Sequence, residues 1–527
     1  MTRSFGFRSL ALLVFFGGFV VATCRVVRQS VRNHAQVTLT LAHLQLESGI
    51  REGLEAVARD YEALHPGIRI RQMLIPERIY TSWGRTQVVG GSGPDLVEMV
   101  HGVGGPTDQP LFRPLTDDIE EPNPYNAGTP LAHVAWRSTY VNGMDEPYLP
   151  FQFERYSASV FATTTRIYYN LDLLREITGR TEPPHTFEDL LGLGEKVRAF
   201  SARTGRDIVP LAGSRTTGSV ILDDLFRGQT QRLAAALNPG GTFPVDTKEL
   251  FLGYLGGQWT LDHPGIRGAA ELMSLICREM PPGFLQFERD DALFYFAQGR
   301  ALMLLASSQD ATGIRQQVSF PFGVFRDPSP QPGKSGFGAN LLGPSADGVL
   351  NVYGGFGIVR SSPHPELALD FLRFLTSQAE DRKFARLSGT LPVIVGIEPE
   401  GFMKHFAPDS RGYPPGPTLW LGSTGQLLVS RMHLLSGPDG SSAAFLDSVR
   451  PVLAGAMRAD LADGVHRDWR EVALNDSGIE ATHRLLRGEP QASALQRKFQ
   501  AMVEAQNEQE ASACYVELKL RQAALSH

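Results

Sequence analysis

The first part of the chain alternates between strand and helix patterns. Residues 36–44, QVTLTLAHL, alternate in character and are rich in strand-forming side chains. Apolar side chains between residues 50 and 64 recur on one helical face, and His65-Pro66-Gly67 ends that helix. Residues 68–75, IRIRQMLI, alternate again. A strand, a helix and a strand with short connections form a βαβ unit, which predicts parallel pairing and an α/β fold.

The pattern continues with a second helix over residues 79–89 and a buried strand over residues 96–100. Ligands of such sheets lie beyond the carboxyl ends of the strands, here residues 43–47 and 98–101. Residues 102–150 are rich in proline and glycine, so we expect a surface excursion there.

Length and charge narrow the classes of protein. The chain has 527 residues, too many for one ordinary hydrophobic core, so two or more domains or lobes are expected. Its formal net charge of −6 argues against a nucleic-acid partner, because such proteins usually carry a basic surplus. The three cysteines are far apart and predict neither a metal site nor a disulfide framework.

The N-terminus has the form of an export signal. Arg3 and Arg8 precede an uncharged stretch of 16 residues, and arginines return at Arg25. The residues before Cys24 resemble a bacterial lipobox, so Cys24 is a candidate lipid anchor. We predict an exported, periplasmic or extracytoplasmic protein that is membrane-anchored at its N-terminus. Lipidation, a retained anchor and a cleaved signal remain alternatives.

Two further local patterns can be interpreted directly. Thr186 and Asp189 have the spacing of a capping box at the start of a helix. Gly354 and Gly355 open a short apolar strand, and Pro365 stands at the first position of the following helix. The absent Cβ atoms of the glycine pair allow backbone or ligand to approach closely.

Five stretches, in this order, resemble the extracellular solute-binding proteins of ABC importers, in the sugar-binding, maltose-binding-protein-like group. They are YEALHPGIRI, GSGPDLVEM, RIYYNLDLLREITGRTEPPHTFEDLL, YFAQGRALMLLASS and the run from Tyr353 through LSGTLPV. The resemblance spans about residues 37–395 and implies a two-lobed periplasmic-binding-protein-like fold, each lobe a helix-covered β-sheet. The chain continues beyond it with a helical C-terminal extension.

The resemblance also implies a division of the chain. We expect an anchor (1–35), lobe 1 in two parts (36–150 and 318–390), lobe 2 in two parts (151–317 and 391–480), and a C-terminal helical extension (481–527).

The implied function is the capture of a sugar or oligosaccharide between the lobes and its delivery to permease subunits. Sugar sites combine aromatic faces with carboxylates, amides and guanidiniums. The candidate ligand-binding residues are Gln45, Glu47, Trp83, Arg85, His101, Glu154, Tyr156, Trp259, Gln309, Asp310, Phe337 and Tyr353. The family often presents a tryptophan where this chain has Gln309, which puts ring stacking there in doubt. Core packing is the alternative for each of these side chains.

Enzyme motifs fail on inspection. Pro328 stands where the phosphate-loop motif requires its first glycine, and neither HExxH nor GxSxG occurs. Adjacent acids such as Asp223 and Asp224 are weak evidence for general acid–base catalysis, because neighbouring side chains do not face each other. We therefore expect no catalytic residues, no cofactor and no metal. A glycan-acting enzyme using cleft carboxylates, and a sensing or scaffolding protein without transport, remain alternative hypotheses.

Overall fold

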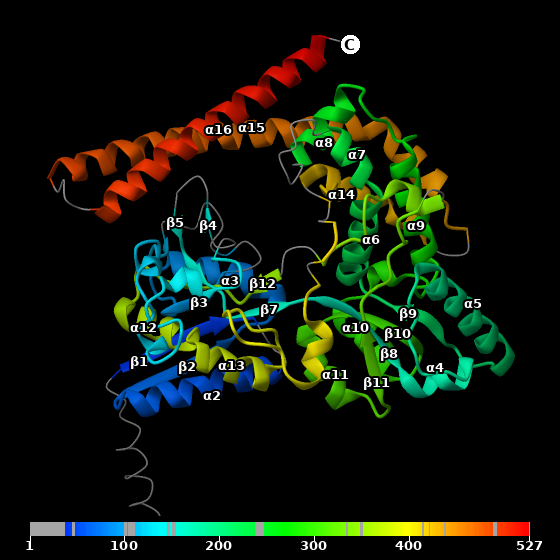
Figure 1. Cartoon of the computed structure of the whole chain (residues 1–527), viewed down its shortest axis with the longest axis horizontal. Coiled ribbons are helices and arrows are strands. Elements are labelled where there is room, and N and C mark those ends of the chain that lie inside the picture. Colours follow the sequence, from blue (N-terminus) through cyan, green and yellow to red (C-terminus); the bar gives the residue numbers. More distant parts are fainter. Residues whose placement is uncertain are drawn as a thin grey trace, which may run out of the picture.

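The computed structural model of the chain describes residues 37–44, 48–99, 103, 111–144, 148–149, 154–237, 247–333, 336–347, 351–409, 411–413, 416–420, 422–436, 439–488 and 493–525. Figure 1 shows two α/β lobes side by side, with a long helical hairpin reaching from one lobe over the other.

Lobe 1 is built on a five-stranded sheet of order β2-β1-β3-β13-β6. β1 pairs in parallel with β2 and β3, which confirms the predicted βαβ unit, whereas β13 runs antiparallel to β3 and β6. The strands are β1 (Val37–His43), β2 (Ile68–Leu74), β3 (Leu96–Glu98), β6 (Ser157–Ala158) and β13 (Phe356–Ile358). The helices are α2 (Ser48–Leu64), α3 (Glu77–Val89), α12 (Pro365–Leu375) and α13 (Gln378–Ser388).

Short elements complete lobe 1. Two small ribbons pair β4 (Tyr148–Leu149) with β5 (Glu154–Arg155), and β7 (Phe161–Thr163) with β12 (Asn351–Tyr353). Besides β4, the described part of the predicted excursion contains turns and the 3₁₀ helices η2 (Asp118–Glu120), η3 (Pro124–Asn126) and η4 (Trp136–Thr139).

Lobe 2 is built on a four-stranded sheet of order β11-β8-β10-β9. The strands are β8 (Thr165–Asn170), β9 (Val209–Ala212), β10 (Ala301–Ser307) and β11 (Phe322–Phe325). The helices are α4 (Leu171–Thr178), α5 (Phe187–Thr204), α6 (Arg215–Gln229), α7 (Gln231–Leu237), α8 (Thr247–Leu255), α9 (Pro264–Cys277), α10 (Arg289–Ala297), α11 (Ala311–Gln317) and α14 (Gly422–Arg431). The 3₁₀ helices are η5 (Phe284–Gln286), η6 (Ser308–Asp310), η7 (Gly336–Asn340), η8 (Gly401–Phe406) and η9 (Met432–Leu435).

Local signals place several helix ends where the sequence predicts them. The Thr186 side chain accepts a hydrogen bond from the backbone of Asp189, and Asp189 accepts one from the backbone of Thr186, so α5 begins with a capping box. Pro365 occupies the first turn of α12, where a missing N–H costs nothing. The buried face of α12, which includes Phe371 and Leu372, packs on the sheet of lobe 1, and burying each such side chain contributes about 1.5–3 kcal/mol.

The strand pairing corrects the predicted lobe boundaries. β6 lies in the range 151–317 that we assigned to lobe 2, yet it pairs with β13 in the sheet of lobe 1. β11 lies in the range 318–390 that we assigned to lobe 1, yet it pairs with β8 in lobe 2. The chain therefore crosses between lobes near Thr164 and again after Phe325, because the partner of each strand, and not the local composition, decides its sheet.

Both the backbone angle and the close neighbours at position 354 require a glycine. Its φ of +64° lies in the left-handed region that side chains rarely adopt, and a Cβ would stand 2.6 Å from the ring of Phe161. At Gly355 a Cβ would stand 2.9 Å from the hydroxyl of Ser157. The glycine pair thus permits residues 354–355 to pass close to residues 157–161.

The C-terminal extension is helical, as predicted. α15 (Ser442–Gly488) and α16 (Ser493–Leu525) pack against each other along the hairpin drawn in orange and red in Figure 1. In the part of the chain that the structure describes, no helix combines the length and the apolar character needed to span a membrane. The predicted anchor, residues 1–35, lies outside the described residues.

Replacing Gly354 by alanine should lower the free energy of unfolding by at least about 2 kcal/mol, because the left-handed angle and the overlap with Phe161 both become strained. Gly192→Ala is the matched control, since Gly192 lies within α5 with open space around its Cβ position. That change should stabilise the protein by up to about 1 kcal/mol. Urea unfolding measures both, and equal stabilities for the two variants would contradict the assignment.

Candidate functional site

Three segments of the chain connect the two lobes, and we call them the crossing segments. The first runs through β7 and β8, over residues 161–170; the second links β11 to β12, over residues 326–351; the third follows α13, over residues 389–420. Both lobes meet at these segments, so we take them as the candidate site.

Hydrogen bonds join the crossing segments to one another. Ala162 and Leu391 exchange backbone bonds of 2.9 and 3.1 Å, which tie the first segment to the third. The Thr164 hydroxyl donates to the carbonyl oxygen of Phe406 at 2.7 Å. The backbone N–H of Asp347 donates to the carbonyl oxygen of Asp409 at 2.9 Å, which ties the second segment to the third. The three segments therefore form one hydrogen-bonded unit.

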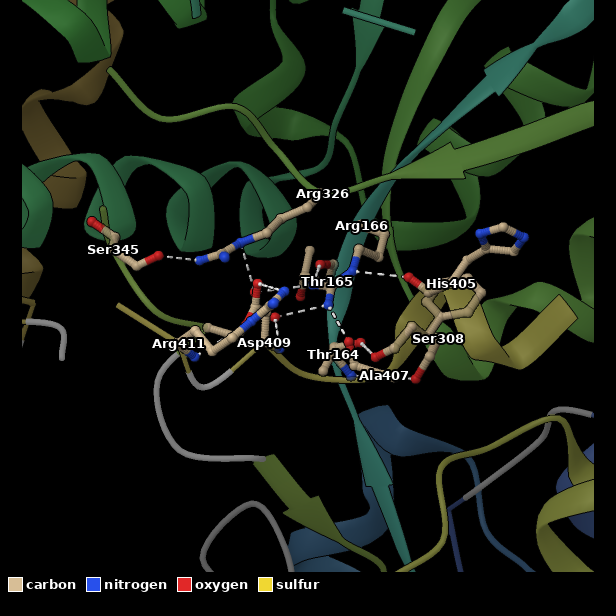
Figure 2. A network of polar contacts seen from close by, with 12 residues as sticks. Thr164, Thr165, Arg166, Ser308, Arg326, Ser345, His405, Ala407, Asp409 and Arg411 are labelled. Carbon is tan, nitrogen blue, oxygen red and sulfur yellow. Dashed lines mark hydrogen bonds and ion pairs between the residues drawn. The ribbon is translucent and has the colours of Figure 1, made fainter. Parts of the chain in front are cut away.

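Arg166 lies at the centre of this unit, and its guanidinium uses all five of its N–H donors (Figure 2). Three of them bind the carbonyl oxygens of Thr165, His405 and Ala407 at 2.8–3.3 Å. The other two donate to the two carboxylate oxygens of Asp347 at 3.2 and 2.9 Å. Arg166 is 3% exposed. Full pairing explains why a charge is tolerated there, because a buried unpaired charge is strongly destabilising.

Asp347 accepts bonds from several sides as well. Besides Arg166, the Nε of Arg326 lies 2.9 Å from its Oδ1, and the N–H of Asp409 donates to its Oδ2 at 2.6 Å. Arg326 also donates to the carbonyl oxygen of Ser345 at 2.5 Å. We call Arg166, Arg326, Asp347 and Asp409 the crossing network.

Asp224, an exposed residue on α6, lies within electrostatic reach of Asp327 and Asp347. Desolvation by the surrounding protein, together with the nearby carboxylates of Asp327 and Asp223, raises the pKa of Asp224 to about 7. Burial likewise raises the pKa of Asp327, while Arg326 opposes the shift. The pKa of the Asp224 carboxyl group therefore lies near neutral pH.

The adjacent Asp223 has different partners from Asp224, because neighbouring residues on a helix point in different directions. It accepts a hydrogen bond from the hydroxyl of Thr418 at 2.5 Å and lies 3.8 Å from a guanidinium nitrogen of Arg227. Arg411 donates to both carboxylate oxygens of Asp409 and lowers the pKa of that carboxyl group to about 2.

Among the lobe-1 candidates, two side chains on α3 keep some exposed surface, whereas Tyr156 is buried and Glu154 is ion-paired. Trp83 on α3 is half-buried, with its ring 6.2 Å from that of Tyr80, and Arg85, two positions further along, is exposed. Tyr156 is 6% exposed within an apolar cluster beneath α3, and burial raises the pKa of its hydroxyl to about 12. The carboxylate of Glu154, on β5, pairs with the ammonium group of Lys498.

Two lobe-2 candidates are occupied by structural roles. Trp259 is 3% exposed in the core of lobe 2, where its Nε1–H donates to the carbonyl oxygen of Leu250 at 2.8 Å, so we correct it to a core residue. The Asp310 carboxylate caps Ser307 N at 2.9 Å and pairs with Arg289, so we correct it to a capping residue of η6.

Two further candidates, Gln309 and Phe337, are partly accessible. Gln309 is half-buried in η6, and Phe337 in η7 is half-buried against the lobe-2 core. The backbone of Tyr353 pairs with Phe161 across the β7/β12 ribbon. Gln45, Glu47, His101 and Cys24 lie outside the described residues.

The sequence reasoning did not find Arg166, Arg326, Asp347 or Asp409. One signal was present: Arg166 interrupts a strand, TRIYYN, whose five last residues are all buried. A charge at a buried strand position implies a partner, but that partner stands 181 positions away. Among the described residues, no three acids, histidines or cysteines converge on a metal position.

Two helix-covered sheets joined by three crossing segments define a two-lobed receptor for small solutes. The chain belongs to the family of bacterial extracellular solute-binding proteins, whose sequence profile matches residues 56–405. Membership of an extracellular family agrees with the predicted export.

Solved structures confirm the two-lobed fold. A chitin oligosaccharide binding protein matches with 17% identity and a TM-score of 0.54, covering 80% of this chain and 99% of that one. Maltose-bound MalE3 of T. maritima matches with 16% identity, the same coverage and a TM-score of 0.55. RafE from Streptococcus pneumoniae matches with 17% identity and a TM-score of 0.53, covering 80% and 98%. No curated protein matches the chain in sequence.

Asp224→Asn should change stability in a pH-dependent way. Because the folded-state pKa of about 7 lies above the unfolded value near 3.9, folding takes up a proton, and the associated stability is full below about pH 4 and lost as the pH rises through about 7. Asparagine removes this loss. The melting temperature of the variant, relative to wild type, should therefore rise between pH 5 and pH 8 in calorimetry.

Asp463→Asn, an exposed aspartate on α15, controls for the removal of one surface charge. A difference for Asp224→Asn that stays flat or falls with pH would contradict the raised pKa.

Proposed function

We propose that the protein is the substrate-binding component of an ABC importer, which captures a sugar or oligosaccharide between its lobes and delivers it to membrane permease subunits. The observation that carries the proposal is the family match over residues 56–405 on a fold with three crossing segments. The names of the similar structures refer to chitin oligosaccharide, maltose and raffinose, which supports a carbohydrate ligand.

Binding would work by population shift. A solute that touches both lobes stabilises the arrangement in which they approach, without covalent chemistry. The crossing network is the proposed pivot of this motion. Its bonds lie within the crossing segments themselves, so the lobes turn around Arg166 while its bonds to Asp347 persist.

The proposed contacts come from both lobes. Trp83 would supply an aromatic face, and Asp224 and Gln309 would bind hydroxyl groups. Gln45, Glu47, Arg85, His101, Phe337 and Tyr353 stay candidates. Each polar group buried by the ligand must be paired, because an unpaired one costs about 1–3 kcal/mol.

The N-terminus completes the proposal. Residues 1–35 would hold the receptor at the outer face of the membrane, with Cys24 as the lipid attachment point, where a permease would be within reach. The C-terminal hairpin supports a second candidate, a sensing protein without transport. α15 and α16 lie beyond the residues that match the family and offer a long surface to another protein.

A thermal-shift screen of mono- and oligosaccharides tests the ligand class. A ligand at 100 times its dissociation constant should stabilise the protein by about 2.7 kcal/mol. Mass spectrometry of the solute that copurifies with the protein should identify the same compound. A response to amino acids, polyamines or metals, with none to any sugar, would defeat the sugar assignment.

Two tryptophan variants localise the response. Trp83→Ala should weaken the best ligand about tenfold, since an aromatic face contributes up to about 1.5 kcal/mol beyond its area. Trp469→Ala, on α15, should leave the affinity unchanged. Equal affinities for the two variants would remove Trp83 from the site.

A further inference from the structure

The base of the C-terminal hairpin is fixed to lobe 2. Phe445, Val449 and Leu453, in the first half of α15, are buried in the same core as α6 and α9. The ammonium group of Lys248, on α8, lies 2.9 Å from the carboxylate of Asp468. Val516 brings the far part of α16 back to that core. The hairpin and lobe 2 therefore form one body.

The outer half of the hairpin is held together by its own contacts. Val472 on α15 and Met502 on α16 are buried, and the ring of His483 stacks on that of Phe499 at 5.5 Å. Gln506, which is 6% exposed, donates to the carboxylate of Asp476 at 2.6 Å. These contacts make the hairpin a stiff arm, which transmits movement of its base to its tip.

Near the tip, the arm contacts lobe 1 through Lys498. Its ammonium group pairs with the carboxylate of Glu154 on β5, and the two side chains are 23% and 14% exposed. β5 is secured to lobe 1, because the N–H of Arg155 donates to the hydroxyl of Thr116 at 2.9 Å and its Nε to the carbonyl oxygen of Met144 at 2.7 Å. The pair therefore joins a group on lobe 1 to a group on the lobe-2 body.

We infer that the α15–α16 hairpin is an interlobe latch, in which the Lys498–Glu154 ion pair holds lobe 1 in its present position relative to lobe 2. In Figure 1 the outer half of the hairpin lies on the lobe-1 side of the molecule, where Lys498 reaches β5, well away from β7 and β8 near the middle. Rotation about the crossing segments displaces distant points most, so the lobes cannot turn far without separating this pair. The second carboxylate oxygen of Glu154 is buried and has no hydrogen-bond partner among the described residues, so in the present arrangement the pairing of this carboxylate depends on Lys498.

The inference needs no ligand, so its test is independent of the proposed function. Spin labels at Arg59 on α2 and Lys196 on α5, both exposed, report the interlobe distance by pulsed electron resonance. The full chain is used, with Cys24 and Cys514 replaced by serine. In the ligand-free protein, Lys498→Met should increase the population of a second interlobe distance, relative to the present one, about fivefold to thirtyfold.

Two further variants complete the test. Lys519→Met makes the same change at an exposed position on α16 and should leave the distance distribution unchanged. The charge exchange Lys498→Glu with Glu154→Lys should restore the wild-type distribution. A Lys498→Met distribution identical to wild type, or a shift of the same size in Lys519→Met, would overturn the latch.

Discussion

The buried pairing of Arg166 with Asp347 is the interaction on which the two-lobed arrangement depends. One guanidinium saturates its donors with atoms from all three crossing segments, so no segment can leave without unpairing donors of a buried, charged group. A buried ion pair is seldom retained for stability alone, because apolar residues of similar volume often serve as well. Here the geometry fixes how the three segments pass one another, and thereby which faces of the two lobes oppose each other.

Aromatic side chains near this pair pack the crossing segments against neighbouring strands. Tyr168 of β8 packs against Phe406 of the third crossing segment, and Phe322 of β11 packs against Phe402. The hairpin adds a second connection through Lys498, on a different side of the molecule and of a different kind. The packed crossing segments resist separation, which suits a pivot. The single Lys498–Glu154 ion pair can break and re-form, which suits a latch.

The sequence predicted the features that neighbouring residues decide. The βαβ pattern, the Thr186 capping box, Pro365 at the start of α12 and the helical C-terminus depend on contacts within a few positions, and the structure confirms them. The lobe boundaries were wrong because a strand's sheet is chosen by distant partners. The prediction for Trp259 was wrong for a more local reason, because the adjacent helix α8 packs against the ring and accepts its N–H bond. Arg166 and Lys498 were missed because their partners lie 181 and 344 positions away, where no periodicity reaches.

Hydrogen exchange at the crossing segments tests the pivot most directly. The measurement follows the amides of Ala162, Asp347, Leu391 and Asp409, all of which donate across segments, in the ligand-free protein and in the protein saturated with the solute that stabilises it. If the lobes turn around an intact network, these amides stay as protected as the core strands in both states. Exchange at the rate of exposed loops in the ligand-free protein would show that the segments separate on opening, and would contradict the account.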